Sequence, residues 1–354
     1  MVTGQLRVHG EMRMRARWLL VHLILITVWV TAGCGPKPGL REDLVWPGPP
    51  DTPRIRYLRS LSSAEDLKQT SKTRLREALL GQKTKDKLIK PYGVVTDSRG
   101  RVFVSDGGNY CVVVFNEHPR PEEKYLMYLG TEASGRLSSP LGIAIDDSDF
   151  VYVGDVQLNR VYVYGPDLKF RFSLGDWSTF SRPSGIAFNP VTNEIIVLDS
   201  GSHDMKFFDR QGNLLRTVGG PGREPGYFNF PTNVAVDARG RIFVVDTMNF
   251  RIQIFSPDGE FISRFGQADN VPGSFSRPRG IALDSEGHVY VSDAAFSNVQ
   301  IFQDNGMLLL FFGNLGSGPG DLRLPAGLWM DKNDRLFVAD QYNERIQIFQ
   351  YLRY

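Results

Sequence analysis

Short runs of alternating apolar and polar residues, separated by turns that carry glycine, recur along most of the chain. The clearest copy reads Pro231-Thr-Asn-Val-Ala-Val-Asp, a turn at Ala-Arg-Gly, Arg-Ile-Phe-Val-Val-Asp, and then Thr-Met-Asn-Phe-Arg-Ile-Gln-Ile-Phe255. Further copies begin at Pro278 and Pro325, at intervals of 47 residues. Alternation over such short runs predicts half-buried β-strands, and a fixed period of this size indicates a repeat architecture.

Six copies align on the same polar and aromatic positions. Their initial prolines are Pro91, Pro140, Pro183, Pro231, Pro278 and Pro325. The first strand of each copy ends at a turn-forming Asp97, Asp146, Asn189, Asp237, Asp284 or Asp331. The second strand ends at Asp106, Asp155, Asp199, Asp246, Asp293 or Asp340, and an aromatic residue stands nine residues after each. Each copy therefore predicts three strands.

A fourth strand is predicted after five of the copies, at 125–130, 170–175, 214–219, 261–266 and 308–313. The sixth copy lacks one because the chain ends at Tyr354, but the same alternation occurs at 54–61. A closed ring would use that strand, since pairing the two chain ends removes exposed sheet edges. We therefore expect an all-β fold, a six-bladed β-propeller whose last blade is closed three-plus-one. A linear β-solenoid is the alternative.

The repeated pattern Pro-x-Gly-Ile-Ala-x-Asp, then Gly-x-Val-Tyr-Val-x-Asp-x-x-Asn-x-Arg-Ile-Gln-Ile-Phe, resembles the NHL repeat family over residues 91–349. The copies at Pro231 and Pro325 match it best, and the copy at Pro278 lacks both its Asn and its Arg. The resemblance implies a six-bladed propeller that acts as a binding platform for protein, RNA or polymer. One enzymatic branch, the peptidyl-hydroxyglycine amidating lyases, holds zinc with histidines.

The N-terminal residues 1–33 are typical of an export signal rather than of a folded element. Basic residues are followed by the apolar stretch 18–30 and by Thr31-Ala-Gly-Cys34, which resembles a bacterial lipoprotein cleavage box. We expect lipid on Cys34 and a protein on the periplasmic side or outer membrane of a Gram-negative cell envelope. An ordinary signal peptide or an uncleaved anchor is the alternative.

Two segments separate this signal from the repeats. Residues 34–53 are rich in proline and predict an extended tether. After the closing strand, residues 62–90 form a polar insert in which a short helix is expected at about 72–80. The propeller proper is therefore assigned to residues 54–354, with its six blades in 91–354.

The composition argues against several kinds of chemistry. The formal net charge is +2, and with an export signal this disfavours nucleic acid as a partner. The two cysteines cannot build a metal cluster, and His203 and His288 are predicted at opposite ends of the channel, where they cannot share a zinc. We expect no cofactor; calcium held by oxygen ligands in the channel is the alternative.

Binding is therefore favoured over catalysis. The alternative is a lyase or hydrolase whose active site, at the channel mouth, uses Ca or Zn. We expect a monomeric propeller that binds a protein or polymer through one face, because exposed aromatic residues and Arg are common interface anchors. The residues proposed for that face are Tyr92, Trp177, His203, Tyr227, Phe228, Met248, Arg279, Phe296 and Tyr342. For Tyr227, Phe228 and Phe275, plugging the clefts between blades is the alternative interpretation.

Overall fold

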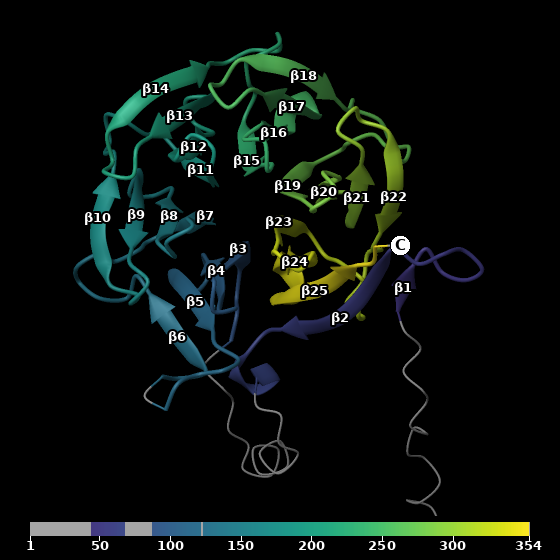
Figure 1. Ribbon diagram of the computed structural model, residues 1–354, viewed down its shortest axis with the longest axis horizontal. Coiled ribbons are helices and arrows are strands. Elements are labelled where there is room, and N and C mark those ends of the chain that lie inside the picture. The colour runs from purple at the N-terminus through teal and green to yellow at the C-terminus, as the bar shows by residue number, and fades with distance from the viewer. Residues whose placement is uncertain (1–43, 68–86, 122, 354) are drawn as a thin grey trace, which may run out of the picture. The chain divides into compact units, whose positions relative to one another are not determined.

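The computed structural model describes residues 44–67, 87–121 and 123–353. Six antiparallel sheets surround a central axis (Figure 1). The innermost strands are β3 (Pro91–Thr96), β7 (Pro140–Ile145), β11 (Pro183–Asn189), β15 (Pro231–Val236), β19 (Pro278–Leu283) and β23 (Pro325–Met330). Each contacts the next, and β23 contacts β3, so the ring is closed. The predicted six-bladed β-propeller is confirmed.

Each blade adds further strands outward from its innermost strand. Blade 1 adds β4 (Val102–Asp106), β5 (Cys111–Phe115) and β6 (Leu126–Leu129). Blade 2 adds β8 (Val151–Asp155), β9 (Arg160–Tyr164) and β10 (Phe170–Leu174). Blade 3 adds β12 (Glu194–Asp199), β13 (Asp204–Phe208) and β14 (Leu214–Gly219). Blade 4 adds β16 (Ile242–Asp246), β17 (Arg251–Phe255) and β18 (Phe261–Phe265). Blade 5 adds β20 (Val289–Asp293), β21 (Asn298–Phe302) and β22 (Leu308–Phe312).

Blade 6 contains both ends of the described chain. Its order from the outside is β1 (Val45–Trp46), β2 (Ile55–Leu61), β25 (Arg345–Tyr351), β24 (Arg335–Asp340) and β23. Strand β2 pairs antiparallel with β25, with Ile55 opposite Tyr351 and Leu61 opposite Ile346. The N-terminal strand therefore occupies the position that the fourth strand holds in the other blades (Figure 1).

The turns between first and second strands are built by the predicted acidic residues. In blade 4, Asp237 Oδ1 accepts hydrogen bonds from the backbone N–H groups of Arg239 and Arg241, at 2.9 and 2.8 Å. Asp284 does the same for Glu286 and His288 in blade 5. A side chain that satisfies backbone donors within its own turn fixes the hairpin locally, which explains why this position is acidic or amide in every copy.

The core lies between blades rather than inside any one of them. The second strands are buried on both faces, as in β16, because a neighbouring blade packs on either side. The aromatic residue at the end of each third strand is buried, for example Phe255 and Phe302. Glycines near the start of the innermost strands let neighbours approach closely: a Cβ on Gly327 would lie 2.6 Å from the Tyr92 carbonyl oxygen.

Two segments near the N-terminus differ from their sequence assignment. Part of the predicted tether is folded, since Val45–Trp46 pairs with β2 and the Trp46 ring lies 5.4 Å from that of Phe312. Part of the polar insert is packed too: it contains a 3-10 helix, η1 (Ala64–Leu67), and Leu88 is buried. The export signal, Cys34 and the helix expected at about 72–80 lie outside the described residues.

Candidate functional site

The propeller has two faces of different construction. We call the face at which the innermost strands begin the loop face; it carries the connections into those strands and the loops between second and third strands. The opposite face, formed by the hairpins between first and second strands, is called the turn face. All of the residues predicted to bind a partner lie on segments of the loop face.

The aspartate that ends each second strand organises the loop face. Asp246, which is fully buried, accepts hydrogen bonds from the Asn229 backbone N–H at 2.7 Å, Asn249 Nδ2 at 2.8 Å and Arg251 Nε at 2.7 Å. Arg251 Nη2 in turn donates to the Tyr227 carbonyl oxygen at 2.9 Å. One carboxylate thus joins the incoming connection to the loop between the second and third strands, and it pairs with the arginine of the repeat.

The same arrangement recurs in blade 6, where Arg345 Nε donates to Asp340 at 2.8 Å and Arg345 Nη2 donates to the Asp321 carbonyl oxygen at 2.9 Å. Blade 3 uses Lys206 in place of Arg, 3.6 Å from Asp199. Burial raises the pKa of Asp199, but the N–H groups of Ser181 and Arg182 and the charge of Lys206 outweigh it, so the net shift is downward. These carboxylates have a structural role, because they accept hydrogen bonds from backbone N–H groups of the loop face.

Four of the predicted partner-binding side chains are well exposed. Trp177 is 67% exposed and Tyr342 is 60% exposed, and Tyr227 and Met248 are each about half exposed. Phe296 and His203 are half-buried, and His203 Nδ1 accepts the backbone N–H of Phe230 at 3.0 Å. The exposed members come from the loops of blades 4 and 6 and from the connections that enter blades 3 and 4.

Phe228 and Tyr92 differ from the exposed aromatic residues expected on this face. Phe228 is fully buried and packs with Phe207 of blade 3 and Phe255 of blade 4, so it plugs the cleft between blades, as Phe275 does in the next connection. Tyr92 is only 6% exposed, and the guanidinium of Arg279 lies 5.0 Å from its ring centroid. The sequence of a loop does not distinguish an aromatic residue that is buried between two blades from one that is exposed to solvent.

Sequence reasoning did not single out several exposed apolar side chains of the same face. Tyr110, Phe230 and Leu315 are all exposed, and they belong to the blade 1 loop and to the connections into blades 4 and 6. Together with Trp177 and Tyr342, these exposed apolar side chains belong to blades 1, 3, 4 and 6 or to the connections that enter them. Their position in the repeat was available from the sequence, but their burial was not.

Cationic residues gather where the innermost strands begin. Five lie within two residues of a repeat proline, and no carboxylate occurs in those windows: Lys90, Arg182, Arg277, Arg279 and Arg323. None of the five has a carboxylate partner among the residues that the structure describes; Arg182 and Arg323 instead lie over the rings of Phe230 and Tyr342. Turn-face arginines such as Arg241 and Arg335 are paired with Asp237 and Asp331.

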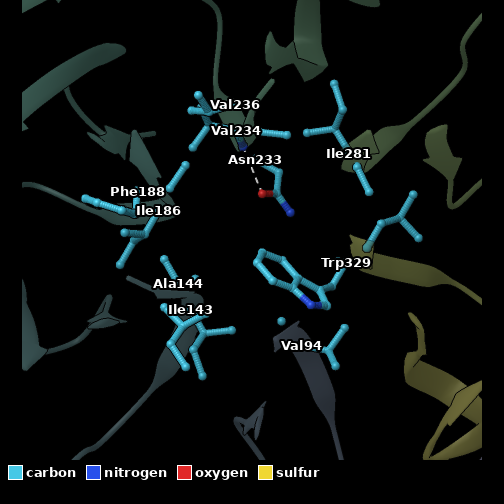
Figure 2. A pocket seen from close by; sticks show the side chains of 18 of the residues that line it. Val94, Ile143, Ala144, Ile186, Phe188, Asn233, Val234, Val236, Ile281 and Trp329 are labelled. Carbon is cyan, nitrogen blue, oxygen red and sulfur yellow. Dashed lines mark hydrogen bonds between the residues drawn. The ribbon is translucent and has the colours of Figure 1, made fainter. Parts of the chain in front are cut away.

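The innermost strands of all six blades enclose a cavity of about 410 Å³ along the axis. Its wall is largely apolar, with Val94, Ile143, Ile186 and Ile281 among the lining side chains (Figure 2). Asn233 and Trp329 face each other across this cavity (Figure 2). Tyr92 lines its loop-face end, and Asp146 and Asp147 line the other end.

Two further observations concern metals and membranes. Within residues 44–67, 87–121 and 123–353, no group of three His, Cys, Asp or Glu side chains is placed to hold a metal ion. His203 lies on the loop face, whereas His288 lies on the turn face, where its Nδ1 is 2.8 Å from Asp284. The part of the chain that the structure describes contains no helix with the length and apolar character of a membrane span.

The fold and its repeats define a class: this is a six-bladed β-propeller that contains NHL repeats. The NHL repeat model matches residues 228–255 and 275–302, which form most of blades 4 and 5. Blade 5 is thus recognised although it lacks the Asn and Arg of the repeat, whereas blade 6, with both, is outside the matched segments.

Individual proteins are similar to this chain at low sequence identity. The protein brain tumor of Drosophila melanogaster is 25% identical over 113 residues, which cover 30% of this chain and 10% of that protein. Among solved structures, a streptogramin B lyase superposes with a TM-score of 0.55 at 13% identity, covering 73% of this chain and 78% of that one. An auxiliary nutrient-binding protein of Bacteroides thetaiotaomicron gives 0.58 at 14% identity, covering 75% and 70%. At such identities the structural likeness establishes the fold alone.

Proposed function

We propose that the loop face binds a protein partner and that the propeller serves as its scaffold. The observation that carries this proposal is the coincidence, on one face, of exposed aromatic side chains from several blades with cations that lack a carboxylate partner in the described chain. Aromatic residues and arginine supply most of the binding energy at protein interfaces, whereas scattered exposed aliphatic residues do not.

The construction of the face supports the same function. Buried aspartates such as Asp246 fix the backbone that carries Tyr227, so the exposed ring is presented from a rigid support. A preorganised surface loses less conformational freedom when a partner binds than a mobile one does. A polymer is the alternative partner, and crosslinking distinguishes it from a protein.

Site-specific photo-crosslinking tests the proposal in the cells that make the protein. A benzophenone amino acid in place of Tyr342 or Tyr227, on the loop face, should give an adduct of the same discrete mass. The same probe in place of Arg239, exposed on the turn face, is the matched control and should give none. Adducts of equal yield from both faces would contradict the proposal, and a diffuse ladder sensitive to glycosidase but not to protease would indicate a polymer.

We further propose that a lipid on Cys34 attaches the chain to a membrane of the cell envelope. The order of basic, apolar and small residues before Cys34 supports this proposal. Labelling with radioactive palmitate should mark the protein, and Cys34→Ala should abolish both the label and membrane fractionation. The Cys111→Ala variant is the control and should keep the label; retention of label by Cys34→Ala would exclude attachment at this residue.

A further inference from the structure

Four of the five cations near the repeat prolines belong to consecutive blades. Arg277 and Arg279 flank the proline that begins β19 in blade 5, Arg323 precedes β23 in blade 6, and Lys90 precedes β3 in blade 1. These innermost strands contact one another in the order β19, β23 and β3 around the axis (Figure 1). We call the four residues the cationic rim. They border the loop-face end of the channel along one continuous side.

Two arginines of the cationic rim are held by aromatic rings rather than by carboxylates. The guanidinium of Arg279 lies 5.0 Å from the ring centroid of Tyr92 in blade 1, and its Nη1 donates to Gln341 Oε1 at 3.2 Å. The guanidinium of Arg323 lies 5.8 Å from the ring centroid of Tyr342. A guanidinium over a ring keeps donors at its edge for a further partner, and it loses little freedom when that partner binds.

The backbone that carries the cationic rim is fixed by the repeated aspartates. Asp106 Oδ1 accepts the backbone N–H of Lys90 at 2.9 Å, and Asp340 Oδ1 accepts that of Arg323 at 2.7 Å. The backbone N–H of Arg277 makes the same bond in blade 5. These three cations are exposed. Each charged group is therefore presented to solvent from a backbone that is already ordered.

The charged donors of the cationic rim are free for an acceptor from outside the chain. Glu344, the acidic residue of the blade 6 loop, is already paired with Lys87 at 2.7 Å. Within the described ranges, no carboxylate lies in ion-pair contact with any of the four rim cations. The channel offers an anion no such contact, because the charged residues that line it are Asp146 and Asp147. An anionic group is therefore favoured on the rim and not inside the channel.

From this arrangement we infer that the cationic rim receives an acidic peptide segment of the partner; the inference rests on the proposed binding of a protein by the loop face. Carboxylates of the segment pair with the rim arginines, as in other recognition of acidic motifs by arginine clusters. Aromatic or apolar side chains between those carboxylates contact Tyr110 and Tyr342, which are exposed in the loops of blades 1 and 6.

A short peptide fits the rim better than a nucleic acid does. The positions around the repeat prolines of blades 2 and 4, Ser138–Gly142 and Asn229–Asn233, contain no cation. The track of positive charge therefore ends after three blades, whereas a nucleic acid presents a long regular series of phosphates. A peptide with a few acidic residues matches a track of this extent.

Isothermal titration of the full chain with a hexapeptide of alternating Glu and Tyr tests the inference, and the hexapeptide of alternating Gln and Tyr is the paired probe. The acidic peptide should bind about tenfold more tightly, and added salt should reduce this difference. Arg277→Gln and Arg323→Gln change exposed residues, and each should weaken the acidic peptide by about threefold, as for an exposed ion pair. Neither should change the affinity for the neutral peptide.

Arg136→Gln is the matched control. Arg136 is an exposed cation of the loop face, but it belongs to the connection into blade 2 and lies outside the cationic rim. The variant should leave both affinities unchanged. The inference is overturned if Arg136→Gln weakens the acidic peptide as much as Arg323→Gln does, or if the two peptides bind equally. Tighter binding of an oligouridylate than of the acidic peptide would also overturn it, in favour of a nucleic acid.

Crosslinking from position 227, which lies outside the cationic rim, separates this inference from the proposed function. In the chain that carries both Arg277→Gln and Arg323→Gln, the adduct from that position should be reduced. An undiminished adduct would overturn the acidic segment and leave partner binding by the loop face intact. Absence of any adduct in the unaltered chain, with selective binding of the acidic peptide retained, would contradict the proposed function and support the charge preference of the rim.

Discussion

Tyr57 lies opposite Phe349 in the ladder between β2 and β25, and their ring centroids are 5.7 Å apart in an edge-on contact. One residue comes from the start of the described chain and the other from its end. The ring is therefore fastened by backbone pairing and by the burial of side chains between β2 and its neighbours, without a covalent link. Residues of β2 should contribute to the stability of the whole propeller.

Replacing Ile55 with alanine tests that contribution. Ile55 is fully buried against Trp46 and Phe349, so Ile55→Ala should lower the free energy of unfolding by about 2–5 kcal/mol. Leu58→Ala in the same strand is the control: Leu58 is 41% exposed, and a change within about 0.5 kcal/mol is expected. Urea unfolding followed by tryptophan fluorescence measures both, and equal effects would mean that β2 does not hold the ring closed.

The close approach of neighbouring innermost strands gives a second prediction. A Cβ at Gly142 would overlap the Ser184 carbonyl oxygen, so Gly142→Ala should destabilise the propeller by about 1–3 kcal/mol. Gly48→Ala is the matched control, because no atom lies within 4 Å of the added methyl group. Thermal melting of the two variants should separate them, and a neutral Gly142→Ala would require the strands to be spaced more widely than in this structure.

Cys111 should be chemically silent while the protein is folded. It is buried between blades, and burial, with the nearby Asp106 carboxylate, raises the pKa of its thiol to about 12. In a Cys34→Ser chain, where Cys111 is the remaining thiol, iodoacetamide at neutral pH should not label the native protein. Labelling should become complete in guanidinium chloride. Rapid labelling without denaturant would show that blade 1 opens to solvent.

The stability of blade 1 should depend on pH through the ion pair between Arg99 and Glu123 on its turn face. Hydrogen bonds from Arg99 and from the Arg120 backbone N–H lower the pKa of Glu123 to about 2. Because the folded-state pKa lies below the unfolded value, the pair's stabilisation is present above about pH 4.3 and is lost as pH falls toward 2. Carboxyl NMR titration should show that Arg99→Gln raises the pKa of Glu123 toward its ordinary value, while Arg239→Gln, in blade 4, leaves it low.

The propeller could be predicted because the residues that mark the strand boundaries recur in all six copies of the repeat. Each innermost strand begins at the proline that marks its copy, and each second strand ends at the marked aspartate. Strand β1 gave no such signal, since Val45–Trp46 is too short to show alternation and is followed by Pro47. Its pairing depends on a tertiary contact between Trp46 and Phe312 that no local pattern encodes.

The candidate sites were less accessible to sequence reasoning. Which residues lie on the loop face follows from the repeat, and Trp177 and Tyr342 are exposed there as expected. Burial of Tyr92 and Phe228 depends on packing against the preceding blade, which contributes Ala326 to the cluster around Tyr92 and Phe207 to the cluster around Phe228. Asn233 departs from glycine in the sequence, but that its amide faces Trp329 becomes evident only once six strands converge on one axis.

Val45 and Tyr351 belong to one sheet, so the first and last strands of the described chain lie in the same blade. The closed ring therefore does not require the chain to be interrupted in blade 6. Joining the two ends by a short peptide and opening the polypeptide elsewhere, for example in the exposed turn at Gln211, would yield a circular permutant with the same six sectors. In such a molecule blade 6 would be built from continuous sequence, and blade 3 would acquire the seam.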